Sequence, residues 1–380
     1  MRSTLRFPPE SEIPRFLLPG AAALLLGCSA GPAKLVGDVN VYVFEESVPP
    51  ALFDVFHAQT GVTVHLSTYA TNEEMLASLA AHPADYDVIM PSDYAVDALI
   101  HRDGLRPLEL GEMPNYANIA PSFLSPWFDP GGIATPGRGR TRNQKFSLPW
   151  LWGTTGIAYD STQVLPAPSH WADVWNPAWA GRVVAPDDAR ELLGVALQAD
   201  GNSKNDTSPA KLAVAKERAI TLAKASVALD SNAPETYFAD GRAVIGIVFN
   251  GNAALAKKSN AYIEFVLPEE GGGIWFDNLA IPAGAKNPDN AVALINHLLS
   301  AESGAEVVRA FPFSTPNEAA LEHLRTVEPA PYAAYMADPI IHPPTDALAK
   351  AVPVKNIGSV GDARMAEAWT AVLAARGATP

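Results

Sequence analysis

Residues 39–66, VNVYVFEESVPPALFDVFHAQTGVTVHL, contain the pattern from which the fold class can be predicted. Residues 39–44 carry the β-branched and aromatic side chains that favour a strand. Residues 51–59 place Leu52, Phe53 and Phe56 on one face of a helix, and Gly61 ends that helix before a second strand over residues 62–66. A strand, a helix and a further strand in this order predict an α/β architecture.

The same alternation continues along the chain. Thr71 and Glu74 have the spacing of a capping box and predict a helix to about Ala81, and residues 86–90 form a short apolar run typical of a buried parallel strand. A later strand is predicted over residues 244–249. Further helices are predicted over residues 209–225, 290–299, 302–310 and 362–375, and surface loops over residues 129–145, 201–209 and 329–344.

The composition describes a globular protein with an acidic surface. The 380 residues are 48% hydrophobic and 18% charged, which allows two lobes of ordinary domain size. A formal net charge of -14 and a pI near 5.0 argue against a nucleic-acid partner, because phosphates require clustered Lys and Arg. The same charge favours cationic ligands.

The N-terminal residues resemble an export signal. Arg2, Arg6 and Arg15 precede an apolar stretch over residues 16–27, which is too short to span a bilayer and ends in Leu25-Leu26-Gly27-Cys28. This ending resembles a bacterial lipobox, so we expect a signal peptide over residues 1–27 and a lipidated tether over residues 28–37, with Cys28 acylated.

The expected consequence is a protein anchored outside the cytoplasmic membrane. Cys28 is the only cysteine, so no structural disulfide is expected. An alternative interpretation is that Cys28 is an ordinary small residue in a buried segment.

The motifs of common enzyme classes are missing from the sequence. It contains no Gly-x-Ser-x-Gly, no His-Glu-x-x-His and no glycine-rich nucleotide motif after a strand. We therefore expect no catalytic residue, no metal and no cofactor.

Carboxylates next to aromatic residues are the remaining chemical signal. In residues 274–282, IWFDNLAIP, Asp277 follows Trp275 and Phe276 in a probable strand. A carboxylate can pair with a protonated amine, and a Trp ring face attracts the same cation. The alternative is a core strand that ends in a solvated acid.

Three other segments combine acids with possible ligand contacts. Residues 44–47, FEES, and residues 92–94, SDY, each follow a predicted strand, where open α/β sheets bind ligands. Asp188 and Glu191 lie at a probable helix start. Helix capping is an alternative role for Ser92, Asp188 and Glu191.

Ten ordered motifs make the sequence similar to one family, the spermidine/putrescine-binding proteins of bacterial ABC importers. They cover roughly residues 38–361 and comprise residues 42–50 (YVFEESVPP), 67–69 with Asn72 and Glu73, 90–94 (MPSDY), 148–153 (LPWLWG), 171–177 (WADVWNP), 187–191 (DDARE), 249–251 (FNG), 268–271 (PEEG), 275–277 (WFD) and 314–317 (STPN).

The resemblance implies a two-lobed α/β periplasmic-binding-protein fold, in which each lobe is a mostly parallel sheet flanked by helices and the ligand lies between the lobes. We expect residues 38–154 and 280–320 in lobe 1, and residues 155–279 and 321–380 in lobe 2. The ligand contacts that it implies, together with the neighbouring Glu45, are Phe44, Glu45, Glu46, Ser47, Ser92, Tyr94, Asp188, Glu191, Phe249, Trp275, Asp277 and Phe313.

Several of these positions depart from the family pattern. Phe44 and Phe249 replace the usual Trp, Ser47 and Phe313 stand where Tyr is common, and Glu45 stands where Ser or Thr is common. Near residue 357, where one branch of the family has a Gln, no polar residue aligns. These changes keep an apolar wall but weaken the attraction of the rings for a cation.

The leading hypothesis is a monomeric, lipid-anchored receptor that captures putrescine or spermidine and delivers it to an ABC permease. Asp277 and either Glu191 or Asp188 would bind ammonium groups, with Trp275, Phe249, Phe44 and Tyr94 along the aliphatic chain. One alternative is a two-carboxylate enzyme resembling a glycosidase. Another is a binding protein retuned to a different organic cation or to sensing.

Overall fold

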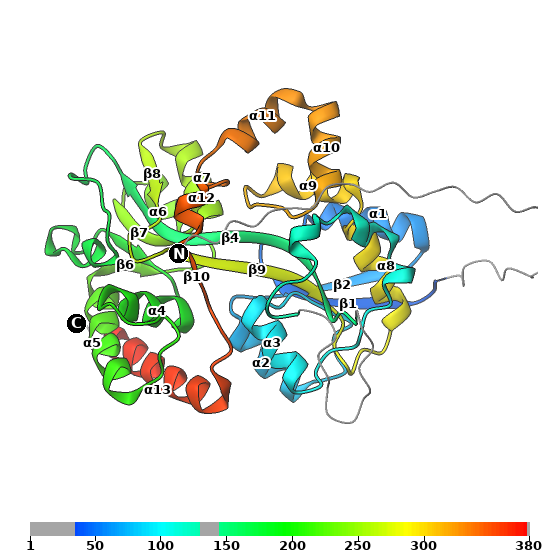
Figure 1. Cartoon of the computed structure of the whole chain (residues 1–380), viewed down its shortest axis with the longest axis horizontal. Helices are drawn as coiled ribbons and strands as arrows, with labels where there is room; N and C mark the ends of the chain where they lie inside the picture. Colours follow the sequence, from blue (N-terminus) through cyan, green and yellow to red (C-terminus); the bar gives the residue numbers. More distant parts are fainter. Residues whose placement is uncertain (1–34, 130–143, 378–380) are drawn as a thin grey trace, which may run out of the picture. The chain divides into compact units, whose positions relative to one another are not determined.

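The computed structural model describes residues 35–129 and 144–377 (Figure 1). Cys28, the expected signal peptide and most of the predicted loop over residues 129–145 lie outside these residues. Within them, strands and helices alternate as predicted, and the strands join into one sheet.

The described residues form a sheet of ten strands. The path runs β2-β1-β3-β9-β4-β7-β5-β6, with β10 paired to β9 and β8 paired to β4. The strands are β1 Asp38–Phe44, β2 Thr63–Tyr69, β3 Val88–Ile89, β4 Ser147–Asp160, β5 Val183–Ala185, β6 Ser226–Leu229, β7 Ile245–Phe249, β8 Ile263–Val266, β9 Gly273–Ala280 and β10 Val352–Pro353.

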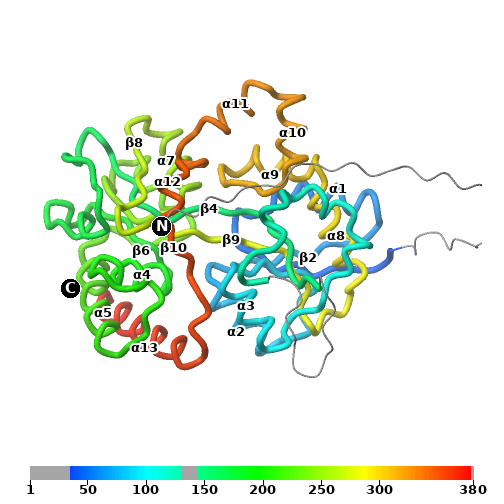
Figure 2. The backbone as a smooth tube through the Cα atoms, viewed as in Figure 1, coloured from blue at the N-terminus to red at the C-terminus, as the bar shows by residue number. Residues whose placement is uncertain are grey.

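The sheet has two parallel sections. The first section contains β2, β1 and β3, and the second contains β7, β5 and β6. The antiparallel strands β4 and β9 run between them, as Figures 1 and 2 show. β4 pairs with β9 along its first part and with β7 and β8 beyond it, and Thr155 is opposite residues of both β9 and β7.

Each section has its own helices. The first is flanked by α1 Pro50–Thr60, α2 Asn72–Ala81, α3 Asp93–His101 and α8 Pro288–Leu298, and the second by α4 Ala189–Ala199, α5 Pro209–Ala225, α6 Glu235–Ala239, α7 Asn250–Ser259 and α13 Gly358–Gly377. The remaining α-helices are α9 Ala301–Ala310, α10 Glu318–Val327, α11 Pro329–Ala337 and α12 Thr345–Leu348. Short 3₁₀ helices span Leu110–Glu112, Pro114–Asn118, Pro121–Phe123, Trp171–Trp175 and Pro177–Trp179.

The apolar core is divided in the same way. Val39, Val41 and Leu294 belong to a cluster around the first section, whereas Leu192 and Ile245 belong to a cluster around the second. Burial of these side chains stabilises each section by the hydrophobic effect. The boundary between the sections is therefore the place where polar side chains can collect without disrupting either core.

Most sequence-based predictions of secondary structure are confirmed, with local corrections. Gly61 ends α1 with φ 78°, and the Thr71 hydroxyl accepts a hydrogen bond from the Glu74 N–H at 3.2 Å. The loop predicted over residues 329–344 is wrong in part, because α11 begins at Pro329. Proline is well tolerated in the first helical turn, where its missing N–H has no intrahelical partner to bond.

The segment over residues 201–209 is a loop as predicted, but it is not wholly at the surface. The Lys204 side chain within it is buried. A long aliphatic side chain with one polar end can be buried when that end finds a partner.

Candidate ligand-binding site

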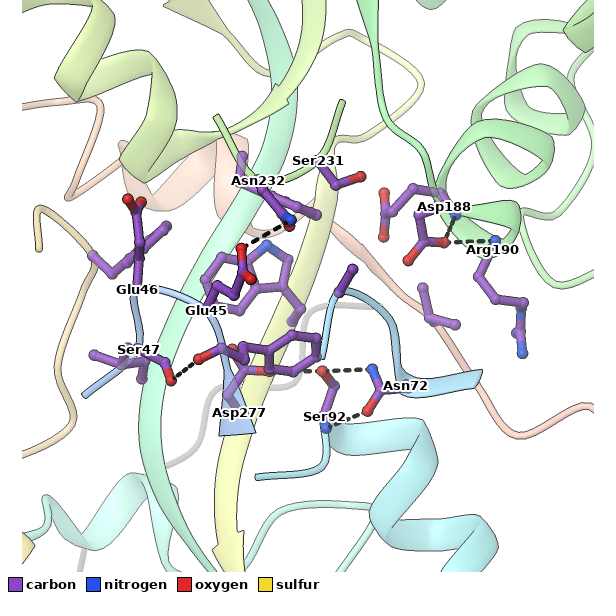
Figure 3. A pocket seen from close by; sticks show the side chains of 18 of the residues that line it. Glu45, Glu46, Ser47, Asn72, Ser92, Asp188, Arg190, Ser231, Asn232 and Asp277 are labelled. Atoms are coloured by element: carbon purple, nitrogen blue, oxygen red, sulfur yellow. Dashed lines mark hydrogen bonds between the residues drawn. The ribbon is translucent and has the colours of Figure 1, made fainter. Parts of the chain in front are cut away.

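One cavity between the two sections brings together all twelve predicted site residues (Figure 3). About 980 Å³ of space, including space open to solvent, lies between its lining residues. Its lining also includes residues that sequence reasoning did not select, namely Ala70, Asn72, Asp93, Leu151, Arg190, Ser231, Asn232, Asn252 and Val354.

The last residue of β1 and the turn after it supply four of the lining residues, 44–47. The Ser47 hydroxyl donates to the Phe44 carbonyl at 2.5 Å, and the Trp150 indole N–H donates to the Ser47 carbonyl at 3.0 Å. Glu46 has φ 53°, a left-handed conformation that is unfavourable for a residue other than glycine. Backbone strain of this kind is concentrated at functional sites.

Glu45 connects the two sections across the cavity. Its carboxylate accepts a hydrogen bond from the Asn232 side chain at 3.1 Å, as Figure 3 shows, and a longer one from the Thr68 hydroxyl at 3.4 Å. Glu45 and Glu46 are both exposed and lie at the rim.

Asp277 on β9 is fixed by a chain of hydrogen bonds from the first section. The Ser92 hydroxyl donates to its Oδ1 at 2.6 Å, and the Asn72 side chain donates to the Ser92 hydroxyl at 2.9 Å while its Oδ1 accepts from the Ser92 N–H at 3.0 Å. The proton of Ser92 is thereby directed at Asp277. Ser92 thus orients the carboxylate and makes no hydrogen bond with its own side chain to the first turn of α3.

Burial raises the pKa of Asp277 from 3.8 to about 7, and the hydrogen bond from Ser92 offsets only part of this effect. The side chain keeps limited exposure to the cavity. A ligand ammonium next to the Asp277 carboxylate would donate hydrogen bonds in place of the missing water. It would thereby favour the ionised carboxylate.

Asp93 is a second buried carboxylate at the same place. It is 0% exposed, and its Oδ1 accepts from the Tyr94 N–H at 2.8 Å. Its Oδ2 has no hydrogen-bond partner within residues 35–129 and 144–377. Burial raises the pKa of Asp93 well above its usual range. The SDY segment of the sequence contained this residue, but nothing there distinguished it from a helix start.

Asp188 both caps α4 and lines the cavity. Its Oδ1 accepts from the N–H groups of Arg190 and Glu191 at 2.7 and 2.9 Å, which confirms the helix-cap interpretation. Burial and the neighbouring acids Glu73 and Glu191 raise the pKa of Asp188 to about 7. Capping uses one carboxylate oxygen, so the two roles are compatible.

Glu191 already has an internal cation. Both of its carboxylate oxygens accept from the buried ammonium of Lys204, at 3.1 and 3.2 Å. Sequence reasoning missed this contact, because Lys204 lies in a segment whose composition predicts a surface loop.

Tyr94 is buried, and its hydroxyl donates to the Glu73 carboxylate at 3.0 Å. The Arg190 guanidinium lies over its ring, 4.9 Å from the centroid. The Arg190 guanidinium therefore already occupies one face of the Tyr94 ring. Tyr94 also lines the cavity, on the side of the first section.

Three aromatic rings form the apolar wall. Phe249 and Phe313 both meet the Trp275 ring edge to face, with centroids 5.8 and 5.6 Å away. Gly153 on β4 leaves room for this ring, because a Cβ there would collide with Trp275 and with Asn250. Near the position where one family branch has Gln, the apolar Val354 lines the cavity.

The described part of the chain offers no metal site and no membrane-spanning helix. No group of three or more His, Cys, Asp or Glu residues in residues 35–129 and 144–377 is arranged to hold a metal ion. In the same residues, no helix is both long enough and apolar enough to cross a bilayer.

Comparison with known proteins identifies the family. The model of the bacterial extracellular solute-binding proteins matches residues 51–339. The chain belongs to this family. The spermidine/putrescine-binding periplasmic protein of Salmonella typhimurium is 36% identical over 302 residues, which are 79% of this chain and 83% of that protein.

More distant members agree with this assignment. The putrescine/cadaverine-binding protein of Pseudomonas aeruginosa is 28% identical over 360 residues, with 90% of this chain and 96% of that protein covered. The spermidine/putrescine ABC transporter substrate-binding protein of Streptococcus pneumoniae has a TM-score of 0.68 and 28% identity, with coverage of 90% and 100%. A solved structure from Listeria monocytogenes has a TM-score of 0.80 at 28% identity, with coverage of 88% and 98%.

These relatives confirm the predicted two-lobed periplasmic-binding-protein fold and the resemblance to the spermidine/putrescine-binding proteins. They are solute-binding proteins, so this chain is a binding protein and the alternative of a two-carboxylate enzyme is set aside. Family members of this kind act outside the cytoplasm.

Proposed function

We propose that this protein is a receptor for a polyamine such as putrescine or spermidine, which it captures outside the cytoplasmic membrane for an ABC permease. The observation that carries the proposal is the pairing of Asp277 with Trp275 on β9, facing one cavity with Asp93 and Asp188. The names of the relatives agree with it.

The charges favour an organic polycation over a sugar or an amino acid. Asp93, Asp188 and Asp277 come from separate elements, and burial raises the pKa of each. Such carboxylates are costly to ionise alone, whereas an ammonium that donates hydrogen bonds to them offsets this cost. Asp188 and Asp277 keep part of their side chains exposed and can accept such a bond, whereas Asp93 is 0% exposed.

The apolar wall suits the methylenes between the amines. Trp275, Phe249 and Phe313 present hydrocarbon surface beside the acids. Burial of each ligand methylene there contributes about 0.8 kcal/mol. A diamine or triamine supplies both of the required parts, and a metal cation supplies only charge.

Closure of the lobes about β4 and β9 is the proposed route of capture. The proposed lobe boundary at residues 154/155 coincides with the point on β4 where its partner changes from β9 to β7. The boundary at residues 279/280 lies at the end of β9. The hydrogen bond between Glu45 and Asn232 would form only in the closed arrangement, because its two residues belong to different lobes.

The remaining parts of the proposal concern location and partners. The lipobox-like sequence before Cys28 supports a lipid anchor, which would keep the receptor near its permease. The two-lobed receptor encloses its ligand within a single chain, so we propose that it acts as a monomer.

A thermal-shift screen followed by isothermal titration calorimetry tests the function. The ligands are putrescine, cadaverine, spermidine, neutral amino acids and sugars, because ligand binding to the folded state raises Tm by linkage. We expect shifts with the amines alone. If no amine raises Tm while a sugar or a neutral amino acid does, the proposal is wrong.

A further inference from the structure

Lys204 is a charged residue buried in a place prepared for it. It lies in the loop between α4 and α5, and its side chain is 1% exposed. Two glycines leave room for it, because a Cβ on Gly194 would lie 3.0 Å from Lys204 Cε and a Cβ on Gly273 would lie 3.1 Å from its Nζ. The side chain thus passes between α4 and the start of β9.

The ammonium of Lys204 ends on a cavity residue. Its Nζ lies 3.1 and 3.2 Å from the two carboxylate oxygens of Glu191, whose side chain is 8% exposed and lines the cavity. Glu191 therefore faces the ligand space on one side and a fixed cation on the other. An amine of the ligand that approached Glu191 would meet an ion pair of zero net charge.

We propose that Lys204 acts as an internal ammonium, lowers by one the number of ligand ammonium groups that the cavity favours, and so selects diamines over triamines. This inference rests on the proposed function. It makes Lys204 a specificity-determining residue that acts through Glu191. It assigns the amine contacts to Asp188 and Asp277, the two partly exposed aspartates of the cavity.

The physical reason is the desolvation of charge. A third ammonium loses its hydration on entering the cavity, and only an unpaired carboxylate offsets that loss. With Lys204 in place, Glu191 is already paired through both oxygens. Diamines and triamines contact the same apolar wall, so the wall does not distinguish them. The receptor distinguishes them because the extra amine of a triamine finds no unpaired carboxylate.

The first test compares putrescine and spermidine affinities of the native protein and K204M by calorimetry. K204M keeps the length and volume of the side chain and removes its charge. We expect the affinity ratio of spermidine to putrescine to rise at least tenfold, because Glu191 becomes available. K204R, which keeps the cation, should retain the native ratio.

A double variant controls for folding and for the route of the effect. K204M/E191Q removes both charges, and a buried ion pair replaced by neutral groups usually leaves a folded protein. We expect its ratio to return to the native value. If the ratio stays at the K204M value, Glu191 has no part in the effect and the inference is overturned. If the ratio falls tenfold below native, Glu191 already binds the third amine in the native protein, which also overturns the inference.

The outcomes separate the two proposals. An unchanged ratio in K204M, in a native protein that binds both amines, overturns the role of Lys204 and leaves the receptor function intact. Failure of the native protein to bind any amine overturns the function and this inference together.

Discussion

Replacing Asp277 with Asn removes the charge of one carboxylate while preserving its size. The Asn oxygen can still accept the hydrogen bond that the Ser92 hydroxyl now gives to Asp277 Oδ1 at 2.6 Å. Two opposite effects are expected. The empty protein gains stability, and binding of an amine is lost.

The gain in stability follows from the pKa of Asp277. Burial raises this pKa from 3.8 to about 7, so the folded state resists ionisation that the unfolded state accepts. The group therefore destabilises the empty protein progressively as pH rises between about 4 and 7. At pH 8 the full difference corresponds to about 4 kcal/mol at 1.36 kcal/mol per pKa unit, an upper limit because cavity water screens the charge.

The loss of binding follows from the charge pair. Removing one partner of a buried, hydrogen-bonded pair costs about 2–5 kcal/mol, which is about a 30-fold to several-thousand-fold weaker Kd. Calorimetry with putrescine measures this loss, and thermal unfolding at pH 5 and pH 8 measures the stability. We expect the Tm of D277N to exceed that of native protein at pH 8 and the difference to shrink at pH 5.

Asp54→Asn is the matched control, because Asp54 is exposed on α1 and belongs to no part of the cavity. It should change neither quantity. If D277N binds putrescine with the native Kd, Asp277 does not hold an ammonium group.

Three further predictions test other parts of the account. Amine affinity should fall as pH decreases from 8 to 5, by up to about tenfold per pH unit for each of Asp188 and Asp277. The reason is that burial raises both pKa values to about 7 and a bound ammonium requires the ionised carboxylates. Calorimetry at several pH values measures the affinity, and an affinity that does not change with pH contradicts this prediction. Gly153→Ala should destabilise the protein by about 1–3 kcal/mol and weaken amine binding, since the new Cβ collides with Trp275. Denaturant unfolding measures the stability. Gly111→Ala is the control, because a Cβ at this position meets nothing within 4 Å. Equal stability of the two variants would show that the ring is free to move. Cys28→Ser should release the protein from the membrane fraction and abolish labelling by a fatty acid, and an unlabelled native protein would contradict the lipid anchor.

The order of strands and helices and the residue types at the strand ends can be predicted from the amino-acid sequence. Local effects are sufficient for this, because periodic apolar residues, Gly61 and the Thr71 cap act on their own segments. The sequence also placed acids beside aromatics in three segments and two acids at a helix start in a fourth, and the structure brings all four segments to one cavity. Helix α11 was missed because a Pro-rich segment satisfies both a loop and a helix that begins with Pro.

Which carboxylates lack a partner depends on the assembled fold. Asp93, Asp188 and Glu191 look alike in the sequence, yet Asp93 keeps an oxygen without a partner in the described residues, Asp188 caps a helix and Glu191 binds Lys204. These differences depend on packing between segments that lie far apart in the chain, as with the 185 residues between Ser92 and Asp277. Propensity and spacing act over a few residues, whereas burial and the partner of a charge are properties of the assembled fold.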